Sequence, residues 1–574
     1  MTGLAGANRR SAFLLLACAV LAAGESAPQA PLLEGPEATR PELPAFEAAP
    51  VEPSDLLPRI DIPRTPDTQG LAGGLRVRLS TVEFSGNRVL SDVELAELAA
   101  PYLGREVSIA DLEALRDDIT RAYVERGYVS SGAIIPEQSI RNGVLRIEVF
   151  EGGLAAIDVE TDGRFRESYI RAQLDIGDRP VNVREIEEKL RLLQQDRRIR
   201  SVHAELEPSE IRGQAVLRVR IVEHPPWAAR LFADNYRNPS IGAYQGTVEV
   251  EFPNVVGYAD SFRTRYSRTE GANFLESVYK MHLPMLAEWG TSWDVHFRWS
   301  DANVVEAPFD RFDISSSLVT IGFTIAQPLY RSPRTRLTAF LTGDWRRSKT
   351  YLLDEPFSFS PGPHRGVATA AVLRGGLDLS VRTQHHAFSA RTQISGGIDA
   401  LAATINEGGI PDGQFLSWLT QAQYALRLPW LGVRLITRAD VQLANSPLLT
   451  LEQFAIGGRY SVRGYRQNQV VGDNGAIGSV ELRIPLWRPS ENRPSLELAP
   501  FFDAGHSWNR DREGLEDFGP FTLLGAGIGA SLSFREWLRA EIYWGTDLKK
   551  LDIPTAWDLQ DTSIYFQVRG GFPR

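Results

Sequence analysis

The chain has 574 residues, with 62 lysine and arginine residues against 72 aspartate and glutamate residues, which gives a formal net charge of -10 at pH 7. This length predicts several domains. The negative charge argues against nucleic acid as a main partner, because a polyanion would be repelled.

The N-terminus has the pattern of a secretory signal peptide over residues 1–24. Arg9 and Arg10 form its basic end, residues 11–23 form its apolar core, and small residues at 22–24 provide a cleavage site. A lipoprotein box ending at Cys18 is the less favoured alternative, because apolar residues continue beyond it. Cys18 is the only cysteine. We therefore expect an exported mature chain without thiols, disulfides or cysteine-based metal sites.

Residues 25–74 contain ten prolines and little apolar sequence, which predicts a semi-extended linker without a core of its own. After the signal peptide, no uncharged apolar run approaches the ~20 residues that a spanning helix requires. If the protein crosses a membrane, the sequence predicts that it does so with strands.

Residues 75–152 and 153–225 show the same pattern of one strand, two helices and two strands, which predicts two small α+β units. In the first unit the expected strands are 75–84, 129–135 and 144–150, and Ser91 and Ser108 are expected to open the two helices.

In the second unit we expect a strand from about Leu154, a helix from about Phe165 and strands at 199–206 and 216–222. A further helix is predicted after Asn182, with Glu185 completing a capping box. Its apolar spacing predicts a buried face, formed by Ile186, Leu190 and Leu193. The prolines after His224 end this unit.

Residues 226–574 change character, because strict polar and apolar alternation replaces helical patterns. The clearest alternating segments are 247–252, 293–299, 480–484 and 538–544. All twelve tryptophans lie here, from Trp227 to Trp557, which suits interfacial girdles. About 350 residues allow roughly sixteen strands of ~10 residues each. We therefore predict an all-β transmembrane barrel of about sixteen antiparallel strands, preceded by the two α+β units.

The end of the chain alternates into an aromatic residue, which resembles the C-terminal signal strand of outer-membrane proteins. Three apolar residues carry this pattern, namely Phe566, Val568 and Phe572. They predict that this segment is a strand of the barrel wall.

Two motifs predict an ion pair inside the barrel. The first is Val462-Arg463-Gly464-Tyr465, and the second is Phe501-x-Asp503-x-Gly505. An arginine flanked by glycine and tyrosine can enter a narrow lumen, and an inward-facing aspartate can accept a bidentate bond from its guanidinium. We expect this pair to hold a loop, residues 454–473, folded inward against the barrel wall.

These motifs resemble the haemolysin secretion/activation family, the TpsB transporters of two-partner (type V) secretion. Gly127-Tyr128, Pro136 and Gln138 resemble a motif of its first POTRA (polypeptide-transport-associated) domain, and residues 179–195 resemble its second. The resemblance covers nearly the whole mature chain. It implies POTRA domains at 75–152 and 153–225 in the periplasm, and a barrel in the outer membrane of a Gram-negative bacterium.

The resemblance further implies that the barrel passes an unfolded exoprotein to the cell surface without ATP. Its partner would be a large TpsA-type adhesin or haemolysin with an N-terminal secretion domain. Outer-membrane lipid and the barrel-assembly machinery would be its other partners, and no cofactor or metal is implied.

Three other functions remain as alternatives. The first is an insertase that folds other barrels, which belongs to the same superfamily. The second is a passive porin or receptor. The third, a membrane-anchored hydrolase, is disfavoured because no set of nucleophile and base stands out from the spacing, and we expect no enzymatic activity. His385 and His386 do not predict a metal site, because adjacent strand residues point to opposite faces.

Overall fold

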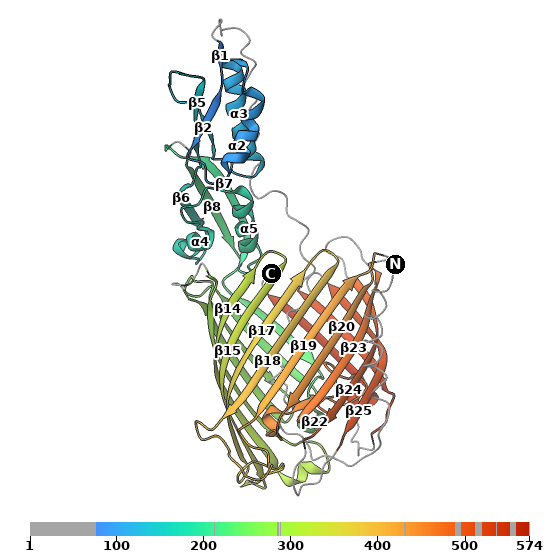
Figure 1. The fold of residues 1–574 in the computed structure, drawn as a ribbon. Helices are drawn as coiled ribbons and strands as arrows, with labels where there is room; N and C mark the ends of the chain where they lie inside the picture. Colours follow the sequence, from blue (N-terminus) through green and yellow to red (C-terminus); the bar gives the residue numbers. More distant parts are fainter. Residues whose placement is uncertain are drawn as a thin grey trace, which may run out of the picture.

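The computed structural model describes residues 76–211, 213–283, 286, 289–429, 432–487, 495–510, 519–534, 537–551 and 558–572. The predicted signal peptide and linker lie outside the described residues. Two small α+β units stand in line at one end of a closed β-barrel (Figure 1). None of the helices in the described ranges is long and apolar enough to cross a membrane.

The first unit contains a three-stranded sheet and two helices. The sheet has the order β2-β5-β4, and β2 and β5 are parallel. Its elements are β2 (Thr81–Ser85), α2 (Asp92–Ala99), η2 (Ala100–Tyr102), α3 (Ile109–Glu125), β4 (Gly132–Ile134) and β5 (Val144–Phe150). Ser91 and Ser108 begin α2 and α3, and each forms a capping box. The two helix starts predicted from the sequence are confirmed.

The prediction of one strand over residues 75–84 is wrong, because the chain breaks after β1 (Arg76–Arg78). Strand β1 pairs with β3 (Glu106–Ser108) and not with the main sheet. Leu79, between β1 and β2, is fully buried, and its N–H donates to the carbonyl of Arg105. The strand breaks because the side chain of Leu79 enters the core at this point. Alternation alone does not reveal such a break. The strand predicted at 129–135 is also shorter, and covers only β4.

The second unit repeats this design with sheet order β6-β8-β7. Its elements are β6 (Leu154–Thr161), α4 (Glu167–Leu174), α5 (Val183–Gln194), β7 (Ile199–Pro208) and β8 (Ala215–Glu223). Ile186, Leu190 and Leu193 form the buried face of α5, as predicted.

The capping box predicted at the start of α5 is wrong. Asn182 does cap the helix, but its Oδ1 accepts from the N–H of Arg184 at 3.0 Å. The carboxylate of Glu185 instead pairs with Arg179 at 2.5 Å. A nearby guanidinium offers Glu185 a charge-assisted bond, which is stronger than the neutral backbone N–H of a capping box.

The described part of the barrel has sixteen long antiparallel strands, in agreement with the predicted fold class. They are β9 (Ala228–Asp234), β10 (Gln245–Pro253), β11 (Ser261–Arg268), β12 (Ala272–His282), β13 (Ser292–Asn303), β14 (Ile314–Arg331), β15 (Thr335–Leu352), β17 (Val367–Arg382), β18 (His386–Ile398), β19 (Leu416–Arg427), β20 (Arg434–Ala444), β23 (Asn474–Trp487), β24 (Ser495–Trp508), β25 (Phe521–Phe534), β26 (Leu538–Asp547) and β27 (Ile564–Phe572). The four alternating segments quoted above lie in β10, β13, β23 and β26. The barrel closes where β27 pairs with β9.

Short elements occur in the loops at the end of the barrel opposite the two α+β units. They are η3 (Pro239–Ile241), η5 (Phe309–Phe312), β16 (Glu355–Pro356), η6 (Thr450–Glu452) and η7 (Leu559–Thr562). The outer face of the barrel is rich in exposed apolar side chains, such as Ile321, Phe323 and Ile325 on β14. Residues that alternate with them point into the lumen, which is the pattern of a barrel surrounded by lipid.

One loop, between β20 and β23, turns back into the barrel. Within it, β21 (Phe454–Ile456) and β22 (Val470–Gly472) form a separate two-stranded sheet. Phe454, Ile456 and Val462 of this loop are buried in a cluster with Leu419 and Ile477 of the barrel wall. We call residues 449–473 the inward loop.

Candidate functional site: the inward loop and its anchors

Arg463, on the inward loop, makes a bidentate ion pair with Asp503 on β24. Its Nε and Nη2 donate to the two carboxylate oxygens at 2.7 and 2.8 Å, and its backbone N–H donates to Asp503 at 3.0 Å. Its Nη1 donates to Glu481 on β23 at 2.5 Å, and Ser479 bridges the guanidinium and Asp503. Arg463 is 3% exposed and Asp503 is fully buried. We call Arg463, Asp503 and Glu481 the first anchor.

Glycines in the wall make room for this contact. A Cβ added to Gly525 on β25 would lie 1.8 Å from the carbonyl oxygen of Arg463. Gly545 on β26 is less crowded, because a Cβ there would lie 3.1 Å from the backbone nitrogen of Gly464 and 3.4 Å from the carbonyl carbon of Arg463. The structure shows that at Gly525 a missing side chain admits the loop.

Aromatic rings complete the surroundings of Arg463. Its guanidinium carbon lies 3.6 Å from the ring centroid of Phe501 and 5.2 Å from that of Tyr543. A desolvated guanidinium over an aromatic face gains a cation–π attraction. Gly505, the last residue of the second motif, has its Cα against Val462, where a Cβ would lie 2.7 Å from Cγ2. Val462, Arg463, Phe501, Asp503 and Gly505 of the two motifs therefore lie around this one contact.

Tyr465 and Gly464 are held by another part of the wall. The hydroxyl of Tyr465 donates to the carbonyls of Leu524 and Lys549 at 3.1 and 2.6 Å. Tyr565 on β27 accepts from the N–H of Gly464 at 3.1 Å and donates to the carbonyl of Tyr465. Gly464 has a φ of +108°, a conformation in which glycine is favoured.

The sequence did not reveal a second set of contacts, at the start of the loop. Glu452 of η6 accepts from Arg346 on β15 at 2.7 Å and from Arg374 on β17 at 2.8 and 3.0 Å. Arg374 also donates to Asp344 at 2.8 Å. The side chains of Glu452 and Arg346 are 3% exposed. We call Glu452, Arg346 and Arg374 the second anchor. Its residues lie far apart in sequence and form no motif.

The POTRA motif residues lie at two places in the first unit. Gly127, with a φ of +95°, ends α3, and its carbonyl accepts from the N–H of Val183 at the start of α5. Tyr128 packs edge-on against Tyr123 in the core. Gln138 donates to and accepts from the backbone of Arg146 on β5 at 2.6 and 2.8 Å. Its side chain thus takes the place of a continuation of β4 along β5, where Pro136 offers no N–H.

The second unit docks on the turn between β10 and β11. Arg198 donates to the carbonyl of Ala259 and pairs with Asp196 at 2.8 Å. The N–H of Arg166 donates to the carbonyl of Gly257 at 3.0 Å. Burial alone would raise the pKa of Asp196, but the charge and hydrogen bonds of Arg198 outweigh it and lower that pKa. Burial, with the Asp196 charge, raises the pKa of Tyr169 beside this contact to about 12.

The residues of the predicted C-terminal signal lie on β27. Val568 is 43% exposed and Phe572 is 57% exposed, and both point away from the lumen. Phe566 packs near Tyr244. In the described ranges no group of three or more His, Cys, Asp or Glu residues could hold a metal ion.

Models of two protein families match the chain. Residues 213–532, more than half of it, match the haemolysin secretion/activation protein ShlB/FhaC/HecB. Residues 77–152 match the POTRA domain of the ShlB type.

Similar proteins are transporters of the outer membrane. The outer membrane transporter CdiB of Escherichia coli O6:K15:H31 is 25% identical over 437 residues, covering 75% of this chain and 72% of CdiB. The heme/hemopexin transporter protein HuxB of Haemophilus influenzae is 22% identical, covering 82% and 83%. A solved structure of CdiB from Escherichia coli superposes with a TM-score of 0.66 at 22% identity, covering 89% and 93%.

The family model, the closed sixteen-stranded barrel and the N-terminal units agree with one another. The chain thus belongs to the haemolysin secretion/activation family ShlB/FhaC/HecB, and is an outer-membrane transporter whose POTRA domains lie in the periplasm.

Proposed function

We propose that this transporter recognises an unfolded exoprotein with its two POTRA domains and passes it through the barrel without ATP. The client would be a large adhesin or haemolysin with an N-terminal secretion domain. The observation that carries the proposal is the continuity of contacts from α3 through α5 to the β10–β11 turn. Through these contacts the second domain adjoins the periplasmic end of the barrel, and the first domain stands in line beyond it (Figure 1).

Strand β7 offers an edge for capturing an extended chain. Gln194 donates to the carbonyl of Arg200 at 3.1 Å and accepts from the N–H of Val202 at 2.9 Å, so these backbone groups point away from β8. Because backbone groups alternate along a strand, Ala204 and Leu206 present theirs on the same edge. Added strands gain main-chain hydrogen bonds that tolerate varied sequence.

In this proposal the two anchors keep the inward loop against the wall, and folding of the client outside the cell supplies the driving force. The sequence contains no Walker motif that could bind a nucleotide.

Comparative proteomics of culture supernatant and outer membrane, with and without the protein, tests the proposal. We expect one large exoprotein to disappear from the supernatant while other barrels are unchanged. General depletion of outer-membrane barrels would instead identify an insertase and refute the proposal.

The capture step has its own test in the same strains. Ala204→Pro removes an outward N–H that the ladder with β8 does not use, so we expect reduced export with a normal amount of barrel. Ala204→Ser, which retains the N–H, is the matched control. Equal export by the two variants would exclude β7 as the capture edge.

A further inference from the structure

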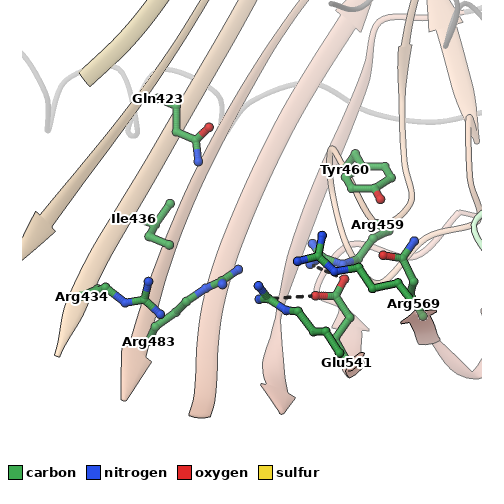
Figure 2. A pocket seen from close by; sticks show the side chains of 10 residues that line it. Gln423, Arg434, Ile436, Arg459, Tyr460, Arg483, Glu541 and Arg569 are labelled. Carbon is green, nitrogen blue, oxygen red and sulfur yellow. Dashed lines mark hydrogen bonds and ion pairs between the residues drawn. The ribbon is translucent and has the colours of Figure 1, made fainter. Parts of the chain in front are cut away.

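A cavity of about 310 Å³ lies in the lumen between the inward loop and the wall from β19 to β27. Figure 2 shows Arg434 and Arg483 together at one side of it, and Arg459, Arg569 and Glu541 at the other. Arg539 is the fifth arginine of its lining. Four of these arginines lie near strand ends on the POTRA side of the barrel, and Arg459 reaches them from the loop.

The wall places arginines directly opposite one another. Arg434 on β20 is the Cα partner of Arg483 on β23, and Arg539 on β26 is the Cα partner of Arg569 on β27. Like charges at directly opposite positions destabilise an antiparallel pair. Two such pairs around one cavity indicate that the charges serve a purpose other than stability.

The carboxylates that the structure describes near the cavity are fewer than these arginines. Arg459 and Arg539 share Glu541, at 3.1 and 3.9 Å. Glu497 pairs with Arg434, and Glu481 pairs with Arg483 as well as with Arg463 of the first anchor. Among the described residues, five guanidinium groups thus face three carboxylates, one of which is shared outside the cavity.

Two further observations show unused donors. The Nε atoms of Arg459 and Arg539 are buried and have no hydrogen-bond partner. Arg569 is exposed to the lumen, and no described residue forms an ion pair with it. A buried donor without an acceptor is costly, so the described residues leave Arg459 and Arg539 incompletely paired, and the exposed guanidinium of Arg569 is the group that an anion in the cavity can reach.

We propose that this cavity binds carboxylate side chains of a polypeptide in extended conformation as it enters the barrel. The nearest members of the two pairs, Arg483 on β23 and Arg539 on β26, lie on strands three spacings apart, roughly 14 Å along the wall. Residues i and i+4 of an extended chain are also roughly 14 Å apart, so two acidic side chains can each meet one pair. A single phosphate cannot span that distance. The inference rests on the proposed function, because it assigns the site to a transported chain.

Binding of an acidic peptide to the purified full-length protein tests this inference without any client. The probe is deca-aspartate carrying an uncharged fluorophore, measured by fluorescence anisotropy at about 0.15 M salt, with deca-serine for comparison. We expect deca-aspartate alone to bind. Arg569→Gln, which breaks no ion pair within the described ranges, should weaken binding roughly tenfold, and Arg569→Lys should weaken it less. The double variant Arg539→Gln/Arg569→Gln should weaken it further.

The matched control is Arg298→Gln on β13, which removes the same charge from the lumen at a pair with Glu276. We expect this variant to bind as the wild type does. Equal affinity of wild type and Arg569→Gln, equal binding of deca-serine, or full displacement by inorganic phosphate at equal ionic strength would overturn the inference. Electrophoretic mobility with and without heating checks that each barrel is folded. If the double variant is not folded, the result for Arg569→Gln alone decides the test.

The proteomic experiment tests the proposed function, and the peptide-binding experiment tests the cavity, so either claim can be refuted without the other. If export is lost without the transporter but Arg569→Gln binds deca-aspartate normally, the inference is wrong and the proposed function stands. If peptide binding depends on Arg569 but no exoprotein is lost, the cavity binds acidic peptide but the assignment to transport is wrong.

Discussion

Glu452 accepts two hydrogen bonds from Arg374 on β17, while Arg463, on the same loop, pairs with Asp503 on β24. Strands β18, β19, β20 and β23 lie between these two wall positions. The inward loop is therefore held at two separate sides of the lumen, each time by buried charges. Removing one partner of a buried ion pair is expensive, because the remaining charge stays desolvated.

The first prediction concerns Arg463→Ala. This change leaves Asp503 and Glu481 buried without their shared cation, so the free energy of unfolding should fall by ~3 to 5 kcal/mol in a denaturant titration. Arg391→Ala on β18 is the control, because its pair with Asp378 is partly exposed and should contribute ~1 kcal/mol or less. Equal losses for the two variants would contradict the prediction.

Exchange of the charges tests whether Arg463 and Asp503 pair directly. The double variant Arg463→Asp/Asp503→Arg should regain only part of the stability that each single change loses. The reason is Glu481, which would then face an aspartate in place of its cation. No recovery at all would argue against a direct pair, and full recovery would mean that Glu481 contributes nothing.

The second anchor gives a prediction for Glu452→Gln. Gln retains the shape but not the charge, so Arg346 and Arg374 lose their common carboxylate and the loop should loosen. Labelling of a Ser461→Cys reporter with maleimide measures this, because Ser461 is buried and Cys18 of the predicted signal peptide is the only other cysteine. We expect labelling at least ten times faster, as a loss of ~3 kcal/mol would allow. Glu407→Gln, at an exposed position, should label at the wild-type rate.

Gly525→Val should prevent the loop from seating, because even a Cβ would lie 1.8 Å from the carbonyl oxygen of Arg463. The same Ser461→Cys reporter should become accessible. Gly478→Val on β23 is the matched control, since a Cβ there meets nothing within 4 Å. Slow labelling in both variants would show that the loop does not need the space above Gly525.

Docking of the second POTRA domain should respond to acid through Asp196. Its pKa in the folded protein is lowered from the usual 3.8, so the stabilisation is complete above pH 3.8 and is lost as the pH falls below it. Energy transfer between dyes on the domain and on the barrel should be constant from pH 8 to 5 and fall below 3.8. In Asp196→Asn this acid step should be missing. A fall between pH 7 and 5 would contradict the assignment.

The fold could be predicted from sequence because each of its elements has a local pattern. Alternation predicted β10, β13, β23 and β26, and Ser91 and Ser108 predicted two helix starts. Local patterns gave wrong predictions where a contact outside the pattern determines the structure. Leu79 breaks a strand because the core requires it, and Glu185 leaves the predicted capping box because Arg179 is near.

The candidate site divides in the same way. Arg463 and Asp503 belong to short motifs, so their proximity could be expected. Glu452, Arg346 and Arg374 lie on three different elements, and only the barrel register brings them together. The opposed arginines of the cavity also depend on register, because Arg434 and Arg483 are adjacent only once β20 pairs with β23.

Tyr565 links the last strand of the barrel to the inward loop. It belongs to β27, which is synthesised after all the other strands of the barrel. Its hydroxyl forms hydrogen bonds with the backbone of Gly464 and Tyr465. The same strand closes the wall against β9. A barrel that lacks this strand thus has both an open seam and an incompletely held loop. Sealing of the wall and seating of the loop are coupled events in biogenesis, completed by the same nine residues.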